Sequence, residues 1–576
     1  MPAALAQTEA DDLIVRRLRI MFWLVGTALA TWQAYTYRHW VNGDAISYLD
    51  MSDAVVQLDL GRLVNGAWSS LYPALIGLVF AVVRPEPAWE FPLLHAVNLL
   101  CFMLAMAALE FLLQPLLRRR EPESNAEWRP LPQWAAYALA QAAFQWSALG
   151  LLTLMKPTPD MLMAAVLFLA VGLAMRVGPL RDGAGIYALL GLVVGIGYYA
   201  KTIMLPLGII LVAASALLAP DLRRGLRGAL IAASLFAVVI APLVAGISRK
   251  AGALSYGAAG RITHLIYIER VNPALGRVGS ARGAFRHPPA RIFENPPVLA
   301  FERPIRASYH YWFDPSYWID GVQSTFDLRR DARSFARNVG MYLQLATRIA
   351  GLILPMLMLV AWSGPRAARA TARRAWPLWL VSSMALGAYA TVHVEERYIG
   401  AFASLFVIGL ATGARTRMAS PRWIVPAIVA LGILNSAIDT AMQIRRESAN
   451  QENIRHNSIR DEEAAMALRA CGLRPGDRVA RINPFVSDGW ARLARVQIIA
   501  EVARGHTEEF WNAPPERQDA VLHALANVGA KAVVGYVYPR REPIPEGWTR
   551  LGSTDYLVRN LLVTDGASGC ANESRG

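Results

Sequence analysis

The sequence predicts a polytopic α-helical membrane protein that ends in a small α/β domain. The first reason is composition: 55% of the 576 residues are hydrophobic and only 18% are charged, which is too apolar for an ordinary soluble chain. The second reason is that apolar runs of roughly 20 residues, the length that crosses about 30 Å of hydrocarbon, recur until about residue 440. We count about eleven such runs as membrane spans.

The expected spans, in chain order, cover residues 18–38, 91–117, 133–153, 161–177, 184–200, 203–219, 228–247, 338–362, 376–392, 399–413 and 423–440. The run from Leu71 to Val83 is too short to cross a bilayer comfortably, so we interpret it as interfacial or re-entrant.

Arginine placement predicts how the spans are oriented. Alternate loops carry the basic clusters, as expected for loops on the cytoplasmic side; these are Arg16, Arg17 and Arg19, then Arg118 to Arg120, Arg176 and Arg181, Arg223, Arg224 and Arg227, Arg366 to Arg374, and Arg415 and Arg417. The same clusters explain the net charge of +15 better than nucleic-acid binding does. We expect a bacterial-type inner (plasma) membrane protein with a cytoplasmic N-terminus and a periplasmic or extracellular C-terminal domain.

Three segments are then long enough to work outside the membrane: residues 39–90, residues 248–337 and the tail after residue 440. We therefore predict a transmembrane domain over 1–440 and an extracytoplasmic α/β domain over 441–576. In the tail, "EEAAMALRACGLRPGDRVARIN" and "RQDAVLHALANVGAKAVVGYVYP" each read as a helix, a turn and a strand. Neither turn has the glycine fingerprint of a dinucleotide site.

No cofactor or metal is expected. Cys101, Cys471 and Cys570 lack metal-ligand spacing, and a Cys471–Cys570 disulfide is left open. Scattered carboxylates make a poor site for Mg²⁺ or Mn²⁺, so a divalent ion is not indicated.

Charged residues gather at the predicted outer ends of the spans. Asp44 lies in "GDAISYLDM", Lys156 and Asp160 in "MKPTPDML", Lys201 in "YYAKTIM" and Arg397 in "HVEERYIG". Each one alone can be explained as solvated or snorkelling, but a charge at the membrane boundary must be solvated, paired or used. Together they provide what a site needs to deprotonate a hydroxyl and hold a phosphate.

In these motifs the chain resembles the C-type (GT-C) integral-membrane glycosyltransferases, which include protein O-mannosyltransferases and the lipid A aminoarabinose transferase. An acid after the first span followed by an amphipathic helix is matched by "GDAISYLDM" and "WSSLYPALIGL", and later family motifs are matched by "TPDML", "YYAKT" and "EERYIGAF". The resemblance covers about residues 15–440. Two departures are the missing "DE" pair in the first loop and Gly400-Ala401 where proline is frequent.

The resemblance implies transfer of a hexose or pentose from a polyprenyl-phosphate donor to an acceptor hydroxyl, with inversion at the anomeric carbon. Asp44 would be the general base, and Asp160 would orient Asp44 or the acceptor. Lys201 and Arg397 would bind the donor phosphate, with Lys156 as a third cation. The acceptor, whether glycan, lipid or protein, and the sugar stay open.

Aromatic side chains supply the remaining candidates. Tyr48 follows Asp44, while Trp312, Tyr317 and Trp318 lie in "YHYWFDPSYWIDG". They are either an aromatic belt at the membrane edge or contacts to the sugar or acceptor.

Other classes of function are an envelope polysaccharide polymerase or ligase, a membrane transporter and a non-catalytic scaffold. A polymerase or ligase would share the lipid-linked substrate but depend more on arginine than on an early aspartate. A transporter would be expected to show paired half-chain repeats, and none is visible.

Overall fold

The computed structural model describes residues 2–118, 128–177, 183–301, 307–417, 421–483, 488–537 and 543–561. These residues are mostly helical and form two compact units, each built from three separate segments. Unit 1 consists of Met1–Thr36, His95–Tyr256 and Asp327–Ala449, and unit 2 of Tyr37–Leu94, Gly257–Phe326 and Asn450–Gly576. The three parts of unit 2 therefore correspond closely to the three segments that the sequence predicts outside the membrane.

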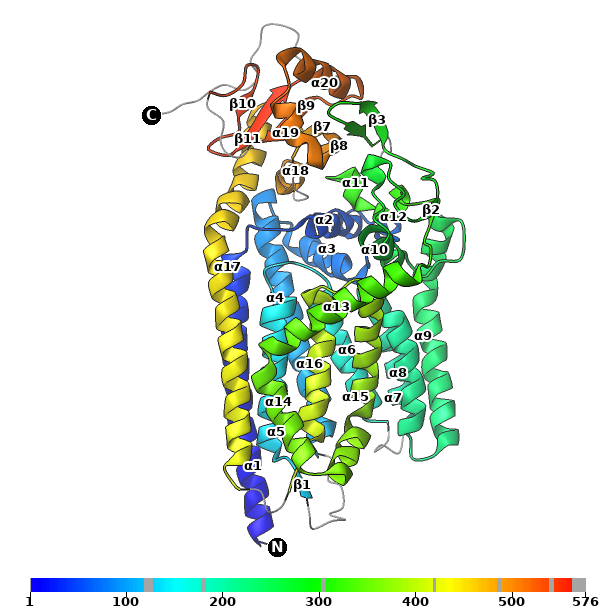
Figure 1. Ribbon diagram of the computed structural model, residues 1–576, viewed down its shortest axis with the longest axis vertical. Coiled ribbons are helices and arrows are strands. Elements are labelled where there is room, and N and C mark those ends of the chain that lie inside the picture. Colours follow the sequence, from blue (N-terminus) through cyan, green and yellow to red (C-terminus); the bar gives the residue numbers. More distant parts are fainter. Residues whose placement is uncertain are drawn as a thin grey trace. The chain divides into compact units, whose positions relative to one another are not determined.

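Unit 1 is a helical bundle (Figure 1). Its elements are α1 (Pro2–Thr36), α4 (Pro87–Arg118), α5 (Gln133–Ser147) with the π-helical turn η2 (Ala148–Leu152), α6 (Asp160–Ala174), α7 (Gly183–Ala200), α8 (Met204–Leu218), α9 (Leu222–Ala251), α13 (Leu328–Arg348), α14 (Ala350–Trp362), α15 (Pro365–Val392), α16 (Glu396–Gly413) and α17 (Ile424–Ala470), with the antiparallel strands β1 (Trp128–Pro130) and β6 (Arg415–Arg417). The first few residues of α4 and the last part of α17 belong to unit 2, so α17 runs through the boundary predicted at residue 440.

Every predicted apolar run falls on these helices, but the number of spans stays a prediction. By length and apolarity alone, three helical segments among the described residues are able to cross a membrane: α4, α9 and the Ile424–Arg446 part of α17. The bent pair α13 and α14 makes a fourth if it counts as one span. Helices such as α6, α7 and α8 are apolar but shorter.

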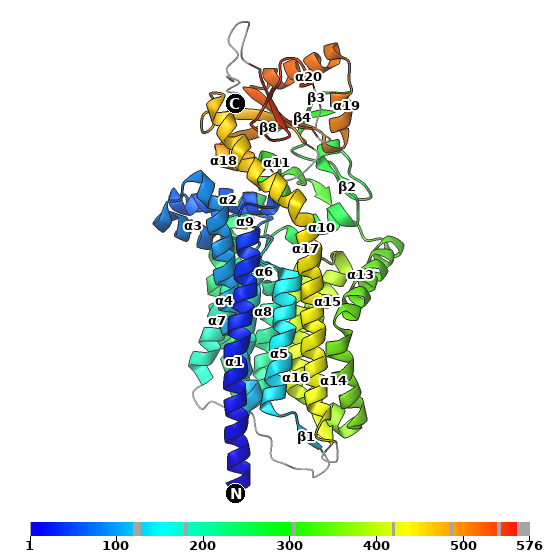
Figure 2. The same cartoon turned by 90° about the vertical axis from the view of Figure 1, so that its left-hand side faces the viewer.

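Small residues allow the helices of unit 1 to approach closely. A Cβ added at Gly191 of α7 would lie 2.2 Å from the backbone oxygen of Ala232 of α9, so only glycine fits there. Such contacts replace the hydrophobic driving force that is missing between helices in lipid. Figure 1 shows α7, α8 and α9 side by side, and Figure 2 shows α1 beside α5.

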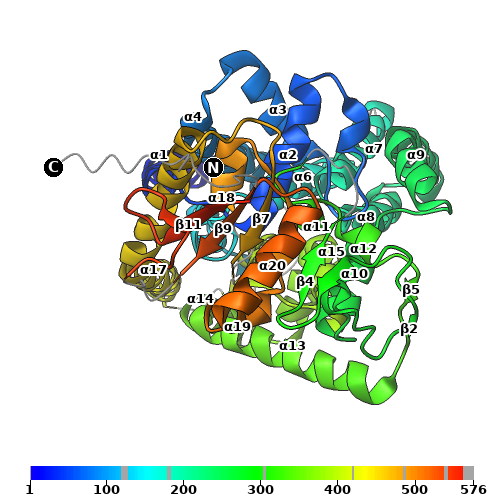
Figure 3. The same cartoon turned by 90° about the horizontal axis from the view of Figure 1, so that it is seen from above.

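The residues of the predicted span 338–362 belong to two helices, not one. α13 ends at Arg348, α14 begins at Ala350, and the two helices meet at 87° (Figure 3). The reason is visible at the joint, where Arg348 donates to Asp439 of α17 at 2.9 Å and to Glu396 of α16 at 2.8 Å. These ion pairs hold the charged end of α13 in place, so the apolar stretch begins only with α14.

Unit 2 contains a seven-stranded sheet in the order β10-β11-β9-β7-β8-β4-β3. Its strands are β3 (Ala290–Phe293), β4 (Val298–Ala300), β7 (Arg478–Ile482), β8 (Gln497–Val502), β9 (Ala532–Tyr536), β10 (Thr549–Arg550) and β11 (Tyr556–Asn560). Neighbours β9, β7 and β8 are parallel and the other pairings are antiparallel. The predicted helix-turn-strand patterns of the tail are confirmed, but β3 and β4 come from the earlier loop.

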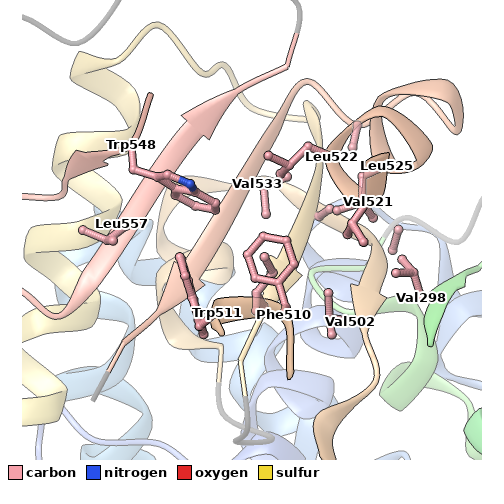
Figure 4. Packing of buried hydrophobic residues seen from close by; sticks show 14 of the residues in the cluster. Val298, Val502, Phe510, Trp511, Val521, Leu522, Leu525, Val533, Trp548 and Leu557 are labelled. Atoms are coloured by element: carbon pink, nitrogen blue, oxygen red, sulfur yellow. The ribbon is translucent and has the colours of Figure 1, made fainter. Parts of the chain in front are cut away.

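One face of this sheet carries the main core of unit 2 (Figure 4). Helix α20 (Pro515–Asn527) packs Val521, Leu522 and Leu525 against strand residues such as Val533. Helix α19 (Thr507–Trp511) adds Trp511, whose ring centroid lies 4.9 Å from that of Trp548. Burying this apolar area is the main stabilising contribution to the fold of the sheet.

The other elements of unit 2 are α2 (Gly43–Val56), α3 (Leu71–Val83), α10 (Ala259–Tyr267), α11 (His310–Phe313), α12 (Pro315–Trp318), α18 (Gly489–Ala494), the turns η1 (Leu60–Leu63), η3 (Pro273–Leu275) and η4 (Arg504–His506), and the paired strands β2 (Arg282–Gly283) and β5 (Val322–Gln323). Helix α3, the short apolar run, packs on α2 within this unit. A Cβ at Gly77 of α3 would lie 2.6 Å from the backbone oxygen of Ser52, so glycine sets this close approach.

Candidate functional site

The structure places six of the nine candidate residues in two clusters, one in each unit, and leaves Lys156, Tyr317 and Trp318 outside them. The first, the Asp44 cluster, consists of Asp44, Tyr48, Trp68, Tyr72 and Trp312 in unit 2. The second, the Lys201 cluster, consists of Asp160, Lys201, Tyr389, Arg397 and Tyr398 in unit 1.

Helix α2 positions Asp44 in its first turn. Asn42 caps this helix by accepting a hydrogen bond from Ala45 N at 3.2 Å, as asparagine does at a helix N-terminus. A carboxylate in the first turn lies near the partial positive charge of the helix dipole. Asp44 is half-buried, so its carboxylate stays in reach of a ligand.

Trp312 of α11 is the neighbour of Asp44. Its indole Nε1 donates to Asp44 Oδ1 at 3.1 Å, and its backbone oxygen accepts from Ser47 Oγ and Trp68 Nε1, each at 3.3 Å. These bonds tie α11 to α2 although the two segments are far apart in sequence. The indole ring of Trp312 is therefore held beside the carboxylate.

Three further rings continue from Trp312. The ring centroid of Trp68 lies 6.1 Å from that of Trp312, and the ring of Tyr48 packs edge-on against Trp68 at 5.6 Å and against Tyr72 at 5.5 Å. Tyr48 and Tyr72 are buried, whereas Trp312 is half-buried. Trp312 and Trp68, which is also half-buried, are thus the accessible rings of this row, while Tyr48 and Tyr72 pack behind them.

A buried ion network fixes the other end of α2. Arg492 of α18 donates to Asp50 at 3.0 Å, to Asp53 at 2.6 Å and to Glu90 at 2.8 Å. Asp50 also accepts from the backbone N and the Oγ of Ser308, both at 2.8 Å. With an exposed fraction of 3%, Asp50 is held by these partners and not by solvent.

The two aspartates of this network have pKa values shifted in opposite directions. Burial raises the pKa of Asp50, although Arg492 opposes it. Burial acts in the same sense on Asp53, but the Arg492 guanidinium outweighs it and lowers the pKa of Asp53. Burial alone would lower the pKa of Arg492; the surrounding carboxylates hold it well above its usual range. The network thus keeps Arg492 charged and α2 attached to α18.

In the Lys201 cluster, the ammonium group is enclosed by an acid and two rings. Lys201 lies in the turn between α7 and α8 and forms an ion pair with Asp160, the first residue of α6. Its Nζ lies 4.1 Å from the ring centroid of Tyr398 and 6.0 Å from that of Tyr389. Cation–π contacts of this kind hold an ammonium while leaving it charged.

Arg397 adjoins the same ring. Its guanidinium carbon lies 5.0 Å from the centroid of Tyr398, and its Nε donates to Glu395 at 2.9 Å. The structure therefore brings together Lys201, Arg397 and Asp160 of the predicted set. Lys156 lies in the turn before α6 and is exposed.

Tyr317 and Trp318 belong to another aromatic group of unit 2. Tyr317 stacks on His287 with centroids 4.2 Å apart and packs edge-on against Trp318 at 5.1 Å. Trp318 is buried and contacts Phe301 and Tyr311. Tyr317 is half-buried and is the more accessible of the two predicted contact residues.

Sequence reasoning missed several of these residues. Tyr398 had a signal, since it follows Arg397 directly, and so did Trp68, which lies in the quoted "WSSLYP" motif. Arg492 had none, because an arginine in a short amphipathic tail helix looks like a solvated residue. Its partners Asp53 and Asp50 are separated from it by 439 and 442 positions.

The described residues contain no group of three or more His, Cys, Asp or Glu side chains arranged to hold a metal ion. Cys101 is a free, buried thiol. Cys471 is disulfide-bonded, and Cys570 lies outside the described residues.

Comparison with known proteins identifies the fold. No protein-family model matches the sequence, and no curated protein matches it. The structure is similar to two crystal structures of ArnT from Cupriavidus metallidurans. The apo form has a TM-score of 0.51 at 11% identity, covering 94% of this chain and 97% of that one. The form bound to undecaprenyl phosphate has a TM-score of 0.54 at 11% identity, covering 95% and 98%.

This likeness confirms the predicted resemblance at the level of fold. ArnT is the lipid A aminoarabinose transferase of the GT-C superfamily, and the match extends over almost the whole of both chains, including the tail.

Proposed function

We propose that the protein is a glycosyltransferase that moves a hexose or pentose from a polyprenyl-phosphate donor to an acceptor hydroxyl on the outer face of the inner membrane. The observation that carries this proposal is the fold likeness, over 95% of the chain, to an ArnT structure that holds undecaprenyl phosphate. The arginine-rich alternate loops support a cytoplasmic N-terminus and an extracytoplasmic unit 2.

Asp44 is the general base in this proposal. Its carboxylate takes the proton of the acceptor hydroxyl while the hydroxyl oxygen attacks the anomeric carbon, so the configuration inverts. A positioned base of this kind accelerates a reaction by typically about 10²–10⁴-fold. The hydrogen bond from Trp312 Nε1 supports this role because it holds the carboxylate in one orientation.

Lys201 and Arg397 bind the phosphate of the donor. The phosphodiester carries about one negative charge, and the leaving lipid phosphate carries nearly two, so cations stabilise the transition state more than the bound substrate. Both cations are already paired, Lys201 with Asp160 and Arg397 with Glu395. Donor binding therefore exchanges or shares these partners, and Asp160 acts as the counter-ion that positions Lys201. Lys156, in the turn before the N-terminus of α6, is a third cation that contributes less to phosphate binding.

The aromatic residues contact the sugar or the acceptor. Trp312 offers a face next to Asp44, and Tyr48 supports it through Trp68. Tyr317 and Trp318 form a separate contact region in the same unit. No step in this scheme passes through a metal ion or a cofactor.

Replacement of Asp44 tests the proposal. In cells that lack the native gene, the Asp44→Asn variant should insert into the membrane and bind undecaprenyl phosphate as the wild type does, but the sugar should be missing from envelope glycans, lipids or proteins analysed by mass spectrometry. Asp59→Asn is the matched control, because Asp59 is an exposed carboxylate of the same unit. Normal transfer by Asp44→Asn would remove Asp44 from the chemistry.

The same analysis separates the alternative functions. A polymerase or ligase would change the length or attachment of a polymer rather than remove a single sugar. A transporter would leave the sugar accumulated on the lipid carrier at one face of the membrane. A missing single sugar with accumulated donor is the result that the proposed transferase requires.

A further inference from the structure

Helix α13 lies across the bundle of unit 1 rather than along it. It meets α14, an apolar helix, at 87°, and in Figure 3 it is seen along its length while α9 of the same unit is seen end-on. α9 is one of the helices long and apolar enough to cross a membrane. Since α13 lies at 87° to α14 and slopes across the bundle in Figures 1 and 2, it does not continue the direction of the spans of its unit.

One face of α13 is anchored to the bundle. Asn338 Nδ2 donates to the backbone oxygen of Ala390 at 2.9 Å, and Tyr342 donates to that of Leu386 at 2.7 Å, both on α15. Ser334, Asn338 and Leu345 are the buried side chains of the helix. The ion pairs of Arg348 hold the C-terminal end. α13 is thus fixed in direction and in rotation.

The rest of the helix surface divides into an apolar and a basic stripe. Leu328, Phe335 and Leu343 form the apolar stripe, with exposed fractions of 72%, 46% and 65%. The basic stripe consists of Arg329, Arg333 and Arg337, which recur every fourth residue and are exposed. Since an amphipathic helix of this type normally buries its apolar face, the fixed rotation leaves the apolar stripe to be covered by something outside unit 1.

We propose that α13 lies in the membrane–water interface, with its apolar stripe on the acyl chains and its three arginines on the phosphate groups of anionic phospholipids. Charge complementarity selects this occupant, because the basic stripe runs parallel to the apolar one along the same helix. In a lipid leaflet, the layer of headgroup phosphates likewise lies next to the layer of acyl chains, so each stripe of α13 meets the matching layer. The guanidinium fork binds two phosphate oxygens at once. The site lies outside the proposed transfer chemistry and does not depend on it.

Spin labels in lipid nanodiscs test the depth of the helix. A label at Leu343→Cys should be accessible to oxygen and protected from a water-soluble nickel chelate, as a label at Val238→Cys on exposed α9 should be. A label at Arg333→Cys should be more accessible to the chelate, approaching the aqueous reference Arg517→Cys of unit 2. If Leu343 matches Arg517, the helix lies in water; if Leu343 is protected from both reagents, a protein covers it. Either result overturns the proposal.

Native mass spectrometry tests the lipid headgroup. The protein, purified with equal amounts of phosphatidylglycerol and phosphatidylcholine, should retain phosphatidylglycerol preferentially, and R329Q/R333Q/R337Q should reduce this preference about tenfold, since each surface arginine contributes to anionic lipid binding. R329K/R333K/R337K should keep most of it. The charge-matched control R261Q/R474Q/R517Q removes three exposed arginines of unit 2 that do not form a stripe. An unchanged preference in the first variant, or an equal loss in the control, contradicts the role of the basic stripe.

Discussion

The indole nitrogen of Trp312 lies 3.1 Å from Oδ1 of Asp44, although 268 positions separate the two residues. This hydrogen bond joins the first loop of unit 2 to the second one. It gives the proposed base a fixed orientation and puts an aromatic face next to it. Removing this hydrogen bond should therefore lower the rate of sugar transfer.

Trp312→Phe keeps an aromatic ring but removes the N–H donor. We expect turnover to fall about tenfold, in keeping with the energy of a hydrogen bond to a charged group, with a smaller change in KM. Trp312→Ala should lower turnover further, because it also removes the ring. Trp89→Phe is the control, since Trp89 lies in the same unit and is 64% exposed. Steady-state transfer rates of the variants and the wild type measure this effect. Equal rates for Trp312→Phe and the wild type would show that the hydrogen bond from Trp312 to Asp44 has no catalytic role.

Lys201→Ala and Arg397→Ala should each reduce turnover at least about tenfold, because each removes a positive charge that stabilises the leaving phosphate. Arg397→Lys should not restore the rate, since an ammonium cannot grip two oxygens. Lys156→Ala should have a smaller effect, because Lys156 is exposed. Transfer rates and binding of undecaprenyl phosphate should be measured together. Near-normal rates in both alanine variants would exclude the two cations from the site.

Arg492→Gln should destabilise the protein by about 3 kcal/mol or more, because it removes the cation that the buried carboxylates of Asp50 and Glu90 share with half-buried Asp53. Arg495→Gln should cost clearly less, since the Arg495 side chain is 33% exposed. Thermal unfolding followed by tryptophan fluorescence measures both variants. If Arg492→Gln melts no lower than Arg495→Gln, the network does not hold α2.

The contrast between these residues shows what sequence can and cannot predict. Asp160, Lys201 and Arg397 are identifiable because each lies where an apolar run begins or ends, and local periodicity reveals those ends. The ion network around Arg492 cannot be identified from the sequence, because its residues meet only through tertiary packing of distant segments. The same limit applies to β3 and β4: their segment shows no clear alternation, and they join the sheet because β4 pairs with β8 of the tail and β3 pairs with β4. The 87° bend at Arg348 depends likewise on partners in α16 and α17.

Unit 2 should become more stable as the pH falls from 8 to about 6.5. Burial raises the pKa of Asp461 to about 7, with the charge of Asp488 adding to it and the hydrogen bond from Tyr556 opposing it. Burial also raises the pKa of Asp488 to about 6. Both lie above the ordinary value of 3.8, so the folded state binds these protons more tightly than the unfolded state, and stability is lost as the pH rises through the folded pKa.

Melting temperatures at pH 8 and 6.5 test this expectation. The window ends near 6.5 because burial lowers the pKa of His310 to about 4, and protonation of this histidine in the unfolded state opposes the trend at lower pH. Asp461→Asn should flatten the pH dependence, since the amide oxygen can still accept from Tyr556 without titrating. Glu516→Gln, which changes an exposed carboxylate of the same unit, should leave it unchanged. A wild-type melting temperature that falls from pH 8 to 6.5 contradicts the assignment.

The tail alone should fold less well than the tail joined to β3 and β4. Without residues 288–301, β8 loses its antiparallel partner β4, whose residues Val298, Leu299 and Ala300 are 0%, 2% and 5% exposed. An unpaired apolar strand edge favours aggregation. We expect residues 455–561 to be poorly soluble, with rapid hydrogen exchange at Glu501 and Ala503, whose amides face Leu299 and Pro297. A version with residues 288–301 attached by a flexible linker should be soluble and protected at both amides. A matched linker carrying Leu299→Asp should fail to rescue, because it places a charge in the buried strand. Equal protection of β8 in all three versions would mean that the tail completes its sheet without the earlier loop.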